Sequence, residues 1–211
     1  MFIEQLPIVY RKLFPGTIWR IPRKEKTVYL TFDDGPIPEV TPFVLELLRK
    51  EGIKATFFCV GDNVRKHPDV FQQVLDEGHL VGNHTFNHLQ GLYTWSRNYI
   101  KNVNLADDYI HSKLFRPPHG FLRYLQFVTL SRKYKIVFWD VVTRDYNQKL
   151  SGEEVMDIVK KYTRNGSIIV FHDSLKAEKN IRYALPRAIA YLRAEGYKFE
   201  VLTEENIKNG I

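Results

Sequence analysis

The sequence is poor in cysteine. Its 211 residues contain a single one, Cys59, so an internal disulfide is excluded. Cys59 lies in the apolar run ATFFCV, and we expect its side chain to pack in the core. A lone cysteine leaves the redox compartment of the protein open, because it requires neither an oxidising nor a reducing environment.

Long apolar runs are also missing. No stretch reaches the roughly 18 uncharged apolar residues that a membrane-spanning helix requires. The opening segment carries Glu4, Arg11, Lys12 and two prolines, and it lacks the ordered basic, apolar and small-residue regions of a signal peptide. We expect residues 1–25 to form an N-terminal arm packed on the domain, with a loose surface anchor as the alternative. We also expect a cytoplasmic location, or the cell envelope or secretion if a leader has been removed.

Motifs for binding dinucleotides or nucleic acids are absent. No G-x-G-x-x-G follows any run that we interpret as a strand. The formal net charge is +7, but the basic residues are scattered, with the densest cluster, IPRKEK, at residues 21–26. We therefore expect no nucleic-acid partner. The positive charge is a hint of an acidic polymer or a cell-envelope surface.

What the chain does contain is an alternation of short apolar runs and amphipathic segments. The runs typical of strands lie at 27–32, 54–61, 79–84, 114–115, 135–140, 167–173 and 197–203. The segments typical of helices lie at 40–52, 67–79, 94–114, 121–134, 151–166 and 177–195. About seven strands alternating with helices indicate a parallel α/β sheet covered on both faces. The pattern leaves open whether the sheet is doubly wound or a barrel, and no linker divides residues 26–211, which we expect to be one domain.

Polar residues gather at the expected carboxyl ends of these strands. They are Asp33, Asp34, His84, His88, Arg116, Asp140, Asp145 and His172. The active sites of α/β sheets and barrels lie at strand carboxyl ends, so a shared site explains this clustering better than chance. The motif TFDDGP by itself is as typical of a solvated turn as of a site.

The spacing of two histidines suggests a metal site. His84 and His88 are four residues apart, and on a helical turn this spacing points both imidazoles to one side. A catalytic zinc ion takes three protein ligands and leaves one position for water, so an aspartate would complete the set. Such a metal lowers the pKa of its bound water towards neutrality. The alternative is a pair of surface or core histidines.

Hydrolysis also requires a base for the water and an acid for the leaving group. The aspartate of TFDDGP that does not bind the metal fits the role of the base, and His172 fits the role of the acid. Arg116 could hold the base ionised through a charge-assisted hydrogen bond, and Asp145 could raise the pKa of His172. Taken singly, Arg116 is more often a salt-bridge residue, and His172 is more often a satisfied buried histidine.

Together these segments resemble the polysaccharide deacetylase family, the NodB-homology domain of carbohydrate esterase family 4, across residues 26–202. Five motifs follow in the family's order: TFDDGP at 31–36, HTFNH at 84–88, RPPHG at 116–120, WDVVTRDY at 139–146 and VFH at 170–172. The resemblance implies a distorted (β/α) barrel with about seven parallel strands. It also implies a divalent metal, most commonly Zn²⁺, with Co²⁺ or Ni²⁺ in some members.

The resemblance assigns roles to individual residues. Asp33 matches the catalytic base and Arg116 the arginine that orients it. The metal ligands that it implies are Asp34, His84 and His88. His172 matches the catalytic acid and Asp145 the aspartate paired with that acid. The implied reaction is attack of metal-bound water on an acetyl carbonyl, which releases acetate and a free amine or hydroxyl.

Three positions depart from the family's usual residues. Tyr146 stands where tryptophan is usual and Val170 where leucine is usual, both in the implied acetyl pocket. Since both replacements remain aromatic or aliphatic, we expect a changed pocket shape and retained chemistry. His119 stands where tyrosine is common, and its backbone N–H matches the donor that stabilises the tetrahedral oxyanion. Its imidazole is either a tolerated substitution or a titratable group at the rim.

The leading hypothesis is a metal-dependent deacetylase of N-acetylated glycans, such as peptidoglycan or chitin-like oligosaccharides. An O-deacetylase of acetylated xylan is the second enzyme hypothesis, because the same site chemistry allows it. A catalytically silent carbohydrate-binding protein on the same scaffold is the alternative from another class. A phosphohydrolase would leave HTFNH without a role. The sequence predicts neither the exact glycan nor the oligomeric state.

Overall fold

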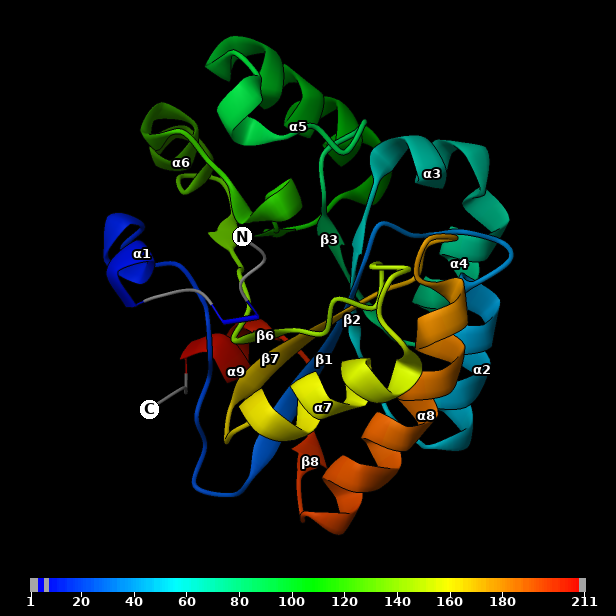
Figure 1. Cartoon of the computed structure of the whole chain (residues 1–211). Helices are drawn as coiled ribbons and strands as arrows, with labels where there is room; N and C mark the ends of the chain where they lie inside the picture. The colour runs from blue at the N-terminus through cyan, green and yellow to red at the C-terminus, as the bar shows by residue number, and fades with distance from the viewer. Residues whose placement is uncertain (1–3, 6–7, 209–211) are drawn as a thin grey trace.

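The computed structural model describes residues 4–5 and 8–208, in which strands alternate with helices (Figure 1). The strands are β1 (Thr27–Asp33), β2 (Thr56–Cys59), β3 (Leu80–Asn83), β4 (Leu114–Phe115), β5 (Lys135–Ile136), β6 (Val141–Val142), β7 (Ser167–His172) and β8 (Lys198–Phe199). The α-helices are α1 (Ile8–Leu13), α2 (Thr41–Lys50), α3 (Gly61–Lys66), α4 (Pro68–Asp76), α5 (Ser96–Ile110), α6 (Tyr124–Leu130), α7 (Gly152–Tyr162), α8 (Glu178–Ala194) and α9 (Glu204–Lys208). Two short 3₁₀ helices are η1 (Gly91–Tyr93) and η2 (Pro118–Gly120).

The described strands form one parallel sheet. Its order is β5-β4-β3-β2-β1-β7-β6, and β8 lies beside the beginning of β1. The seven-strand path curls into a half-barrel with helices packed outside it (Figure 1). The distorted barrel of about seven parallel strands that the sequence resemblance implied is therefore confirmed. Because the strands are parallel, their carboxyl ends meet at one end of the half-barrel.

The alternation of side chains along β1 separates the core from the site. Val28, Leu30 and Phe32 belong to the main hydrophobic cluster and are at most 1% exposed. Successive strand residues point to opposite faces, so Thr31 and Asp33 face the interior of the half-barrel. Full burial of a leucine or phenylalanine side chain stabilises the fold by about 1.5–3 kcal/mol, which fixes this register firmly.

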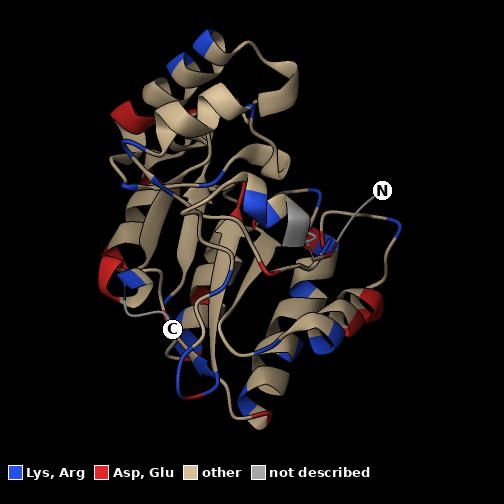
Figure 2. Cartoon of the chain, turned by 90° about the vertical axis from the view of Figure 1, so that its left-hand side faces the viewer, with Lys and Arg blue, Asp and Glu red and all other residues tan. Residues whose placement is uncertain are grey.

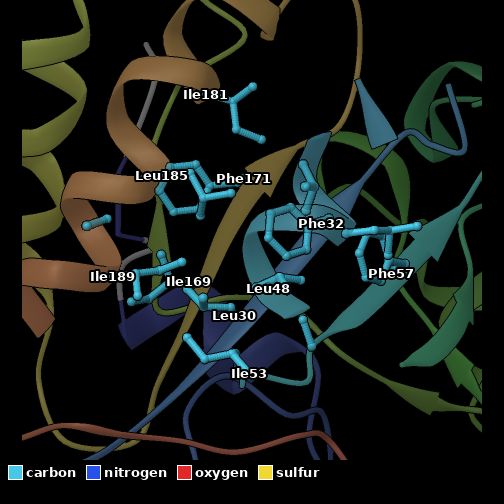
Figure 3. Close-up of a cluster of buried hydrophobic side chains, with 14 of the residues drawn as sticks. Leu30, Phe32, Leu48, Ile53, Phe57, Ile169, Phe171, Ile181, Leu185 and Ile189 are labelled. Carbon is cyan, nitrogen blue, oxygen red and sulfur yellow. The ribbon is translucent and has the colours of Figure 1, made fainter. Parts of the chain in front are cut away.

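Strand β7 repeats the same alternation beside β1. Ile169 and Phe171 point to the helical side, where they meet the apolar face of α8 (Figure 3). The side chains of α8 in this contact are Ile181, Leu185 and Ile189. Val170 and His172 consequently face the interior, as Thr31 and Asp33 do. Cys59, at the end of β2, is 1% exposed in the same core, as expected from the sequence.

The expectation of one strand over residues 135–140 is wrong. Only β5 (Lys135–Ile136) forms there. An irregular segment follows it, β6 begins at Val141, and the N-terminal arm pairs with the irregular segment at Val137. Ile18 donates its backbone N–H to the Ile136 carbonyl (2.9 Å) and accepts from the Phe138 N–H (2.7 Å). Further along the arm, Ile21 donates to the Gly166 carbonyl (2.9 Å). Residues 18–21 therefore link β5, at one edge of the curled sheet, to the beginning of β7.

Asp140 consequently does not lie at a strand's carboxyl end, and its inclusion among the candidate site residues is wrong. It precedes β6, and its carboxylate accepts hydrogen bonds from Arg11 (3.0 Å), from Arg164 (2.7 and 2.8 Å) and from Ser167 (2.8 Å). Ser167 begins β7 whereas His172 ends it, so Asp140 lies at the opposite end of the half-barrel from His172. It anchors the arm through the Arg11 ion pair.

The expected helices are present with shifted ends. The capping box expected at the start of the 151–166 helix is confirmed, since Glu154 N–H donates to Ser151 Oγ (3.2 Å) and Ser151 N–H donates to Glu154 Oε2 (2.7 Å). The sequence did not predict α3 or α9, because helices of six and five residues show too little periodicity. The segment expected as a helix over 121–134 contains only α6, which begins at Tyr124.

Charged residues of both signs are spread over the surface. Figure 2 shows Lys and Arg interspersed with Asp and Glu on the helices and loops of one side of the molecule. Among residues 4–5 and 8–208, no helix combines the length and the hydropathy that crossing a membrane requires.

Candidate active site

The TFDDGP motif forms a turn at the carboxyl end of β1. Asp33 is the last residue of the strand, and Asp34 has a left-handed backbone with φ of 85°. The Gly35 N–H donates to Asp173 Oδ1 (3.0 Å), and Asn63 Nδ2 donates to the Asp34 carbonyl (2.8 Å). A Cβ on Gly35 would lie 1.9 Å from Asp173 Oδ2, so only glycine fits there. The turn thus presents two adjacent carboxylates in fixed and different directions.

Asp33 forms a buried ion pair with Arg116, which follows β4. Arg116 Nη1 donates to Asp33 Oδ1 (2.6 Å) and to Thr31 Oγ1 (2.8 Å). The remaining guanidinium donors reach the carbonyls of Phe138 (2.9 Å) and Val137 (3.3 Å). Arg116 is fully buried, and these contacts fix its orientation. Charge-assisted bonds of this kind are shorter and stronger than hydrogen bonds between neutral groups.

His84 and His88 lie on the loop after β3, and the expectation that a helical turn carries them is wrong. Thr85 and His88 have positive φ values of 64° and 53°, which an α-helix does not allow. Asn102 on α5 supports the loop, because its Oδ1 accepts two successive backbone N–H groups at 2.9 and 3.0 Å. Both imidazoles nevertheless reach the same centre, with ring centroids 5.1 Å apart.

Asp34, His84 and His88 form a cluster of side chains that can hold a metal ion, and we call these three residues the metal cluster. One candidate ligand atom from each lies within 4.8 Å of the others. His84 Nδ1–H donates to the Arg116 carbonyl (2.7 Å), which leaves the lone pair of Nε2 available. Asp34 Oδ1 accepts no hydrogen bond of good geometry from the residues described, although His88 Nε2 lies 3.1 Å away. Two electron-rich atoms this close repel each other unless a proton or a cation lies between them.

The protonation state of His84 suits a metal ligand. Burial lowers the pKa of His84 to about 4, against the opposing charge of Asp33. The imidazole is therefore neutral at pH 7, the form that binds metals. Two imidazole nitrogens and one carboxylate oxygen are ligands that Zn²⁺ accepts, with a fourth position open, and Co²⁺ and Ni²⁺ accept the same donors.

His172 and Asp145 form a second pair across the site. His172 Nδ1 lies 2.7 Å from Asp145 Oδ1, and the His172 backbone N–H donates to Asp145 Oδ2 (2.7 Å). Burial alone would lower the pKa of His172, but the charge and hydrogen bond of Asp145 outweigh it and raise the pKa to about 9. The imidazole consequently carries a proton at neutral pH in this structure. Its Nε2–H is the group left free to donate.

The three remaining sequence-predicted residues surround these pairs. The His119 ring packs against His88 with centroids 4.9 Å apart, and burial lowers the pKa of His119. The Tyr146 ring meets His172 edge-on at 4.7 Å. Val170 precedes His172 by two residues on the same face of β7 and is 1% exposed. The structure therefore brings all ten expected residues to the carboxyl end of the half-barrel.

Several further residues, not predicted from the sequence, support this site. Asp173 holds the TFDDGP turn through Gly35 and also accepts from Thr41 Oγ1 (2.6 Å). Burial raises the pKa of Asp173 to about 8. Asn180 on α8 donates to the Asp145 carbonyl (3.0 Å). Asp173 directly follows His172 at a strand end, so its position was a usable signal, whereas Asn180 gave none.

A cleft of about 420 Å³ opens beside the metal cluster. Asp34 and His88 border it on the site side. The other residues that line it are Ile37, Val60, Asp62, Asn63, Asn87, Ser174, Leu175 and Lys176. The amide side chains of Asn63 and Asn87 and the amine of Lys176 suit a polar ligand with hydroxyl groups, and Leu175 offers an apolar contact.

The chain is similar to curated deacetylases along most of its length. It is 35% identical over 194 residues to a Peptidoglycan-N-acetylglucosamine deacetylase of Bacillus cereus, covering 88% of this chain and 91% of the relative. It is 34% identical to the Peptidoglycan-N-acetylmuramic acid deacetylase PdaA of Bacillus subtilis, with coverages of 86% and 72%. It is 32% identical to a Chitooligosaccharide deacetylase of Azorhizobium caulinodans, with coverages of 84% and 90%.

Solved structures extend this similarity to the fold. The Bc1960 peptidoglycan N-acetylglucosamine deacetylase superposes with a TM-score of 0.83 at 29% identity, covering 93% of this chain and 95% of the other. BA3943 of Bacillus anthracis, described as a CE4 family pseudoenzyme, superposes with a TM-score of 0.77 at 26% identity, with coverages of 91% and 69%. Residues 20–137 match the family model described as Polysaccharide deacetylase. The chain belongs to the polysaccharide deacetylase family.

Proposed function

We propose that this protein hydrolyses the acetamido group of N-acetylated glycans, such as peptidoglycan or chitin-like oligosaccharides, to acetate and a free amine. The observation that carries the proposal is the meeting of three units at one end of the half-barrel. These units are the Asp33–Arg116 ion pair, the Asp34, His84 and His88 cluster, and the His172–Asp145 pair. They supply the base, the metal ligands and the acid that amide hydrolysis requires.

Asp33 is the base in this proposal. Its Oδ1 is bound by Arg116, and its Oδ2 lies 4.0 Å from His84 Nε2 on the side of the metal ligands. Oδ2 is therefore available to take the proton of a water that attacks the acetyl carbonyl. Because Arg116 is fully buried and held by two carbonyls, Asp33 cannot rotate away from this position.

Asp34, His84 and His88 would hold the metal, for which we propose Zn²⁺. A divalent metal bound there lowers the pKa of a water molecule and polarises a carbonyl oxygen. The chain's own contribution is to keep the ligands in place. Arg116 links two of the units, since its side chain binds Asp33 while its carbonyl accepts from His84.

His172 is the acid. Hydrolysis breaks the C–N bond, and the leaving amine requires a proton as that bond breaks. Asp145 keeps His172 protonated and fixes Nδ1 as the buried side of the ring, so Nε2–H is the donor. The Tyr146 ring restricts the imidazole from its edge.

The backbone N–H of His119 is the proposed donor to the oxyanion that forms on the acetyl oxygen. It lies on η2 beside His88, and its left-handed φ of 59° sets the direction of this turn. A fixed backbone donor of this kind stabilises the transition state without reorganisation. Val170 and Tyr146 would line the pocket for the acetyl methyl group.

A catalytically silent binding protein is the second candidate, because one structural neighbour is described as a pseudoenzyme. The presence of both the base and the acid, each with a partner at 2.6–2.7 Å, favours catalysis. The O-deacetylation of xylan uses the same groups, and only a substrate comparison separates it from amide hydrolysis.

The deciding experiment measures acetate release from N-acetylglucosamine oligomers, peptidoglycan and acetylxylan with added Zn²⁺ or Co²⁺. We expect release from the N-acetylated substrates by the wild type and a loss of several orders of magnitude in Asp33→Asn. Asp157→Asn, a carboxylate exposed on α7, is the matched control and should retain full activity. No release on any substrate with either metal would exclude the enzyme, and release only from acetylxylan would favour the esterase.

A further inference from the structure

Exposed apolar side chains are concentrated on one small surface next to the site. Ten large apolar residues are exposed among those described, and five of them lie within residues 92–95 and 124–125. We call these five the aromatic platform: Leu92 (42% exposed), Tyr93 (83%), Trp95 (75%), Tyr124 (72%) and Leu125 (63%). Scattered exposed apolar residues are ordinary, but a contiguous group of this kind marks an interaction site.

The two segments of the platform are fixed to each other. Arg123 Nε and Nη2 both donate to the Leu92 carbonyl, at 3.0 and 2.7 Å. Gln126 Nε2 donates to the carbonyls of Gly91 (3.0 Å) and Thr94 (3.1 Å). A Cβ on Gly91 would lie 2.4 Å from the Phe121 carbonyl oxygen, so the backbones touch closely. The exposed rings therefore stand on a rigid support.

The platform is a continuation of the two loops that carry His88 and His119. Tyr93 follows His88 by five residues and Tyr124 follows His119 by five residues. Five residues span at most about 18 Å, so the backbone of Tyr93 lies within that distance of His88, and the backbone of Tyr124 lies within that distance of His119. The rings of His88 and His119 are themselves 4.9 Å apart.

The platform and the cleft lie on different sides of the metal cluster. The cleft is lined by Asp62 and Asn63 of α3 and by Lys176, which precedes α8. The platform includes the beginning of α6. Figure 1 shows α6 at the upper left of the half-barrel and α3 and α8 at the right, with β3 between them. A long ligand could therefore run from the cleft past the metal cluster onto the platform.

The chemistry of the platform suits an uncharged glycan. Arg123 is the only charged residue in segments 91–95 and 123–126, and its guanidinium is bound to the Leu92 carbonyl and lies 5.5 Å from the Trp95 ring centroid. The surface thus presents ring faces rather than a free cation for acidic lipid headgroups. Aromatic faces are electron-rich and pack on the C–H groups of a pyranose ring, while the tyrosine hydroxyls hydrogen-bond to its oxygens.

We infer that the aromatic platform binds sugar units of the substrate chain beyond the one that is deacetylated, and so makes the enzyme prefer longer glycans. This inference rests on the proposed function, because it takes the glycan in the catalytic site as the occupant. Only chains that extend several units from the metal cluster reach the platform. Short oligomers therefore react without its help.

The test compares Tyr93→Ala/Tyr124→Ala with the wild type on N-acetylglucosamine oligomers of two to six units. Both side chains are strongly exposed, so the folded state tolerates their loss. We expect KM for the hexamer to rise about tenfold, with kcat unchanged, and KM for the dimer to stay the same. The tenfold change corresponds to about 1.4 kcal/mol, within the range of two aromatic contacts. Leu75→Ala, an exposed apolar residue of α4, is the control and should change neither value.

Equal effects on dimer and hexamer, or no effect on either, would overturn the inference. Sedimentation with phosphatidylcholine vesicles, with and without phosphatidylglycerol, is measured in parallel. A second contrary result is that the wild type binds the vesicles while the double variant does not, with KM values unchanged in the variant. That result would show that the platform binds a membrane surface, and it would also overturn the inference. If the wild type releases no acetate at all, the proposed function fails. Glycan binding by the platform is then tested separately, by comparing the retention of the wild type and the double variant on insoluble chitin. Equal retention of the wild type and the double variant would exclude glycan binding by the platform.

Discussion

The guanidinium of Arg116 donates a 2.6 Å hydrogen bond to the carboxylate of Asp33, and these side chains are only 0% and 6% exposed. Arg116 also donates to Thr31, Val137 and Phe138, so two segments of the half-barrel, β1 and the stretch that follows β5, depend on one side chain. A buried charge that loses its partner is strongly destabilising, because the remaining charge has neither water nor a counter-ion. The pair consequently links the stability of the fold to the proposed chemistry.

Arg116→Met should lower the free energy of unfolding by about 3–5 kcal/mol, because it leaves Asp33 buried and unpaired. The double variant Arg116→Met/Asp33→Asn removes that charge and should recover part of the loss. Urea unfolding of the wild type, both single variants and the double variant gives the coupling between the two residues. Additive losses would show that the ion pair contributes little beyond its separate contacts.

The two adjacent carboxylates of TFDDGP should respond differently to neutralisation. Asp34→Asn should weaken Zn²⁺ binding more than about 100-fold, because loss of even an outer partner of a metal ligand costs 10–100-fold. Asp33→Asn should leave the affinity within a few-fold, since Asp33 is bound to Arg116 rather than among the ligand atoms. Calorimetric titration of each metal-free variant with Zn²⁺ measures both values. Equal weakening would contradict the division of roles between base and ligand.

The pKa of His172 should depend on Asp145. In the metal-free protein we expect a pKa near 9, and in Asp145→Asn a clearly lower pKa, because burial is then opposed only by the charges of Asp34 and Asp33. A histidine whose pKa is raised by folding stabilises the fold fully below its unfolded pKa of 6.5, and this contribution disappears as pH rises through 9. NMR titration of the His172 imidazole in the wild type and in the variant measures the difference between the two pKa values. An unchanged pKa in the variant would remove Asp145 from this role.

Gly35→Ala should disrupt the turn by steric conflict. The added Cβ would lie 1.9 Å from Asp173 Oδ2, so the carboxylate that holds the Gly35 N–H has to move. We expect a loss of about 3 kcal/mol or more in stability, typical of an overpacked buried site, together with loss of activity. Gly16→Ala is the matched control, since Gly16 has φ of 77° and open space around it. Its cost should be about 1 kcal/mol, from backbone strain alone.

The sequence predicted most of the candidate site because the relevant signals are local. TFDDGP, HTFNH and His172 each follow an apolar run directly, and parallel strands bring such positions to one end of the sheet. What failed depended on contacts distant in sequence. Asp140 follows an apolar run too, but that run is a strand only at Lys135–Ile136, and Asp140 lies beside Ser167 at the other end of β7. The loop of His84 and His88 is held by Asn102 rather than by helical hydrogen bonds, which the four-residue spacing could not reveal.

The N-terminal arm should influence the site through Tyr10. Its hydroxyl donates to the Gly120 carbonyl (2.8 Å), directly after His119, whose backbone N–H is the proposed oxyanion donor. Tyr10→Phe keeps the ring and removes this bond, so we expect a loss of about 1 kcal/mol in stability and a several-fold lower kcat with KM unchanged. Tyr99→Phe is the matched control, because the buried Tyr99 hydroxyl has no hydrogen-bond partner among the residues described, and its removal should cost nothing. Thermal unfolding and steady-state kinetics of both variants decide the matter. A stability loss in Tyr10→Phe with full kcat would limit the arm to a structural role, because the turn at His119 would then hold its geometry without the hydroxyl.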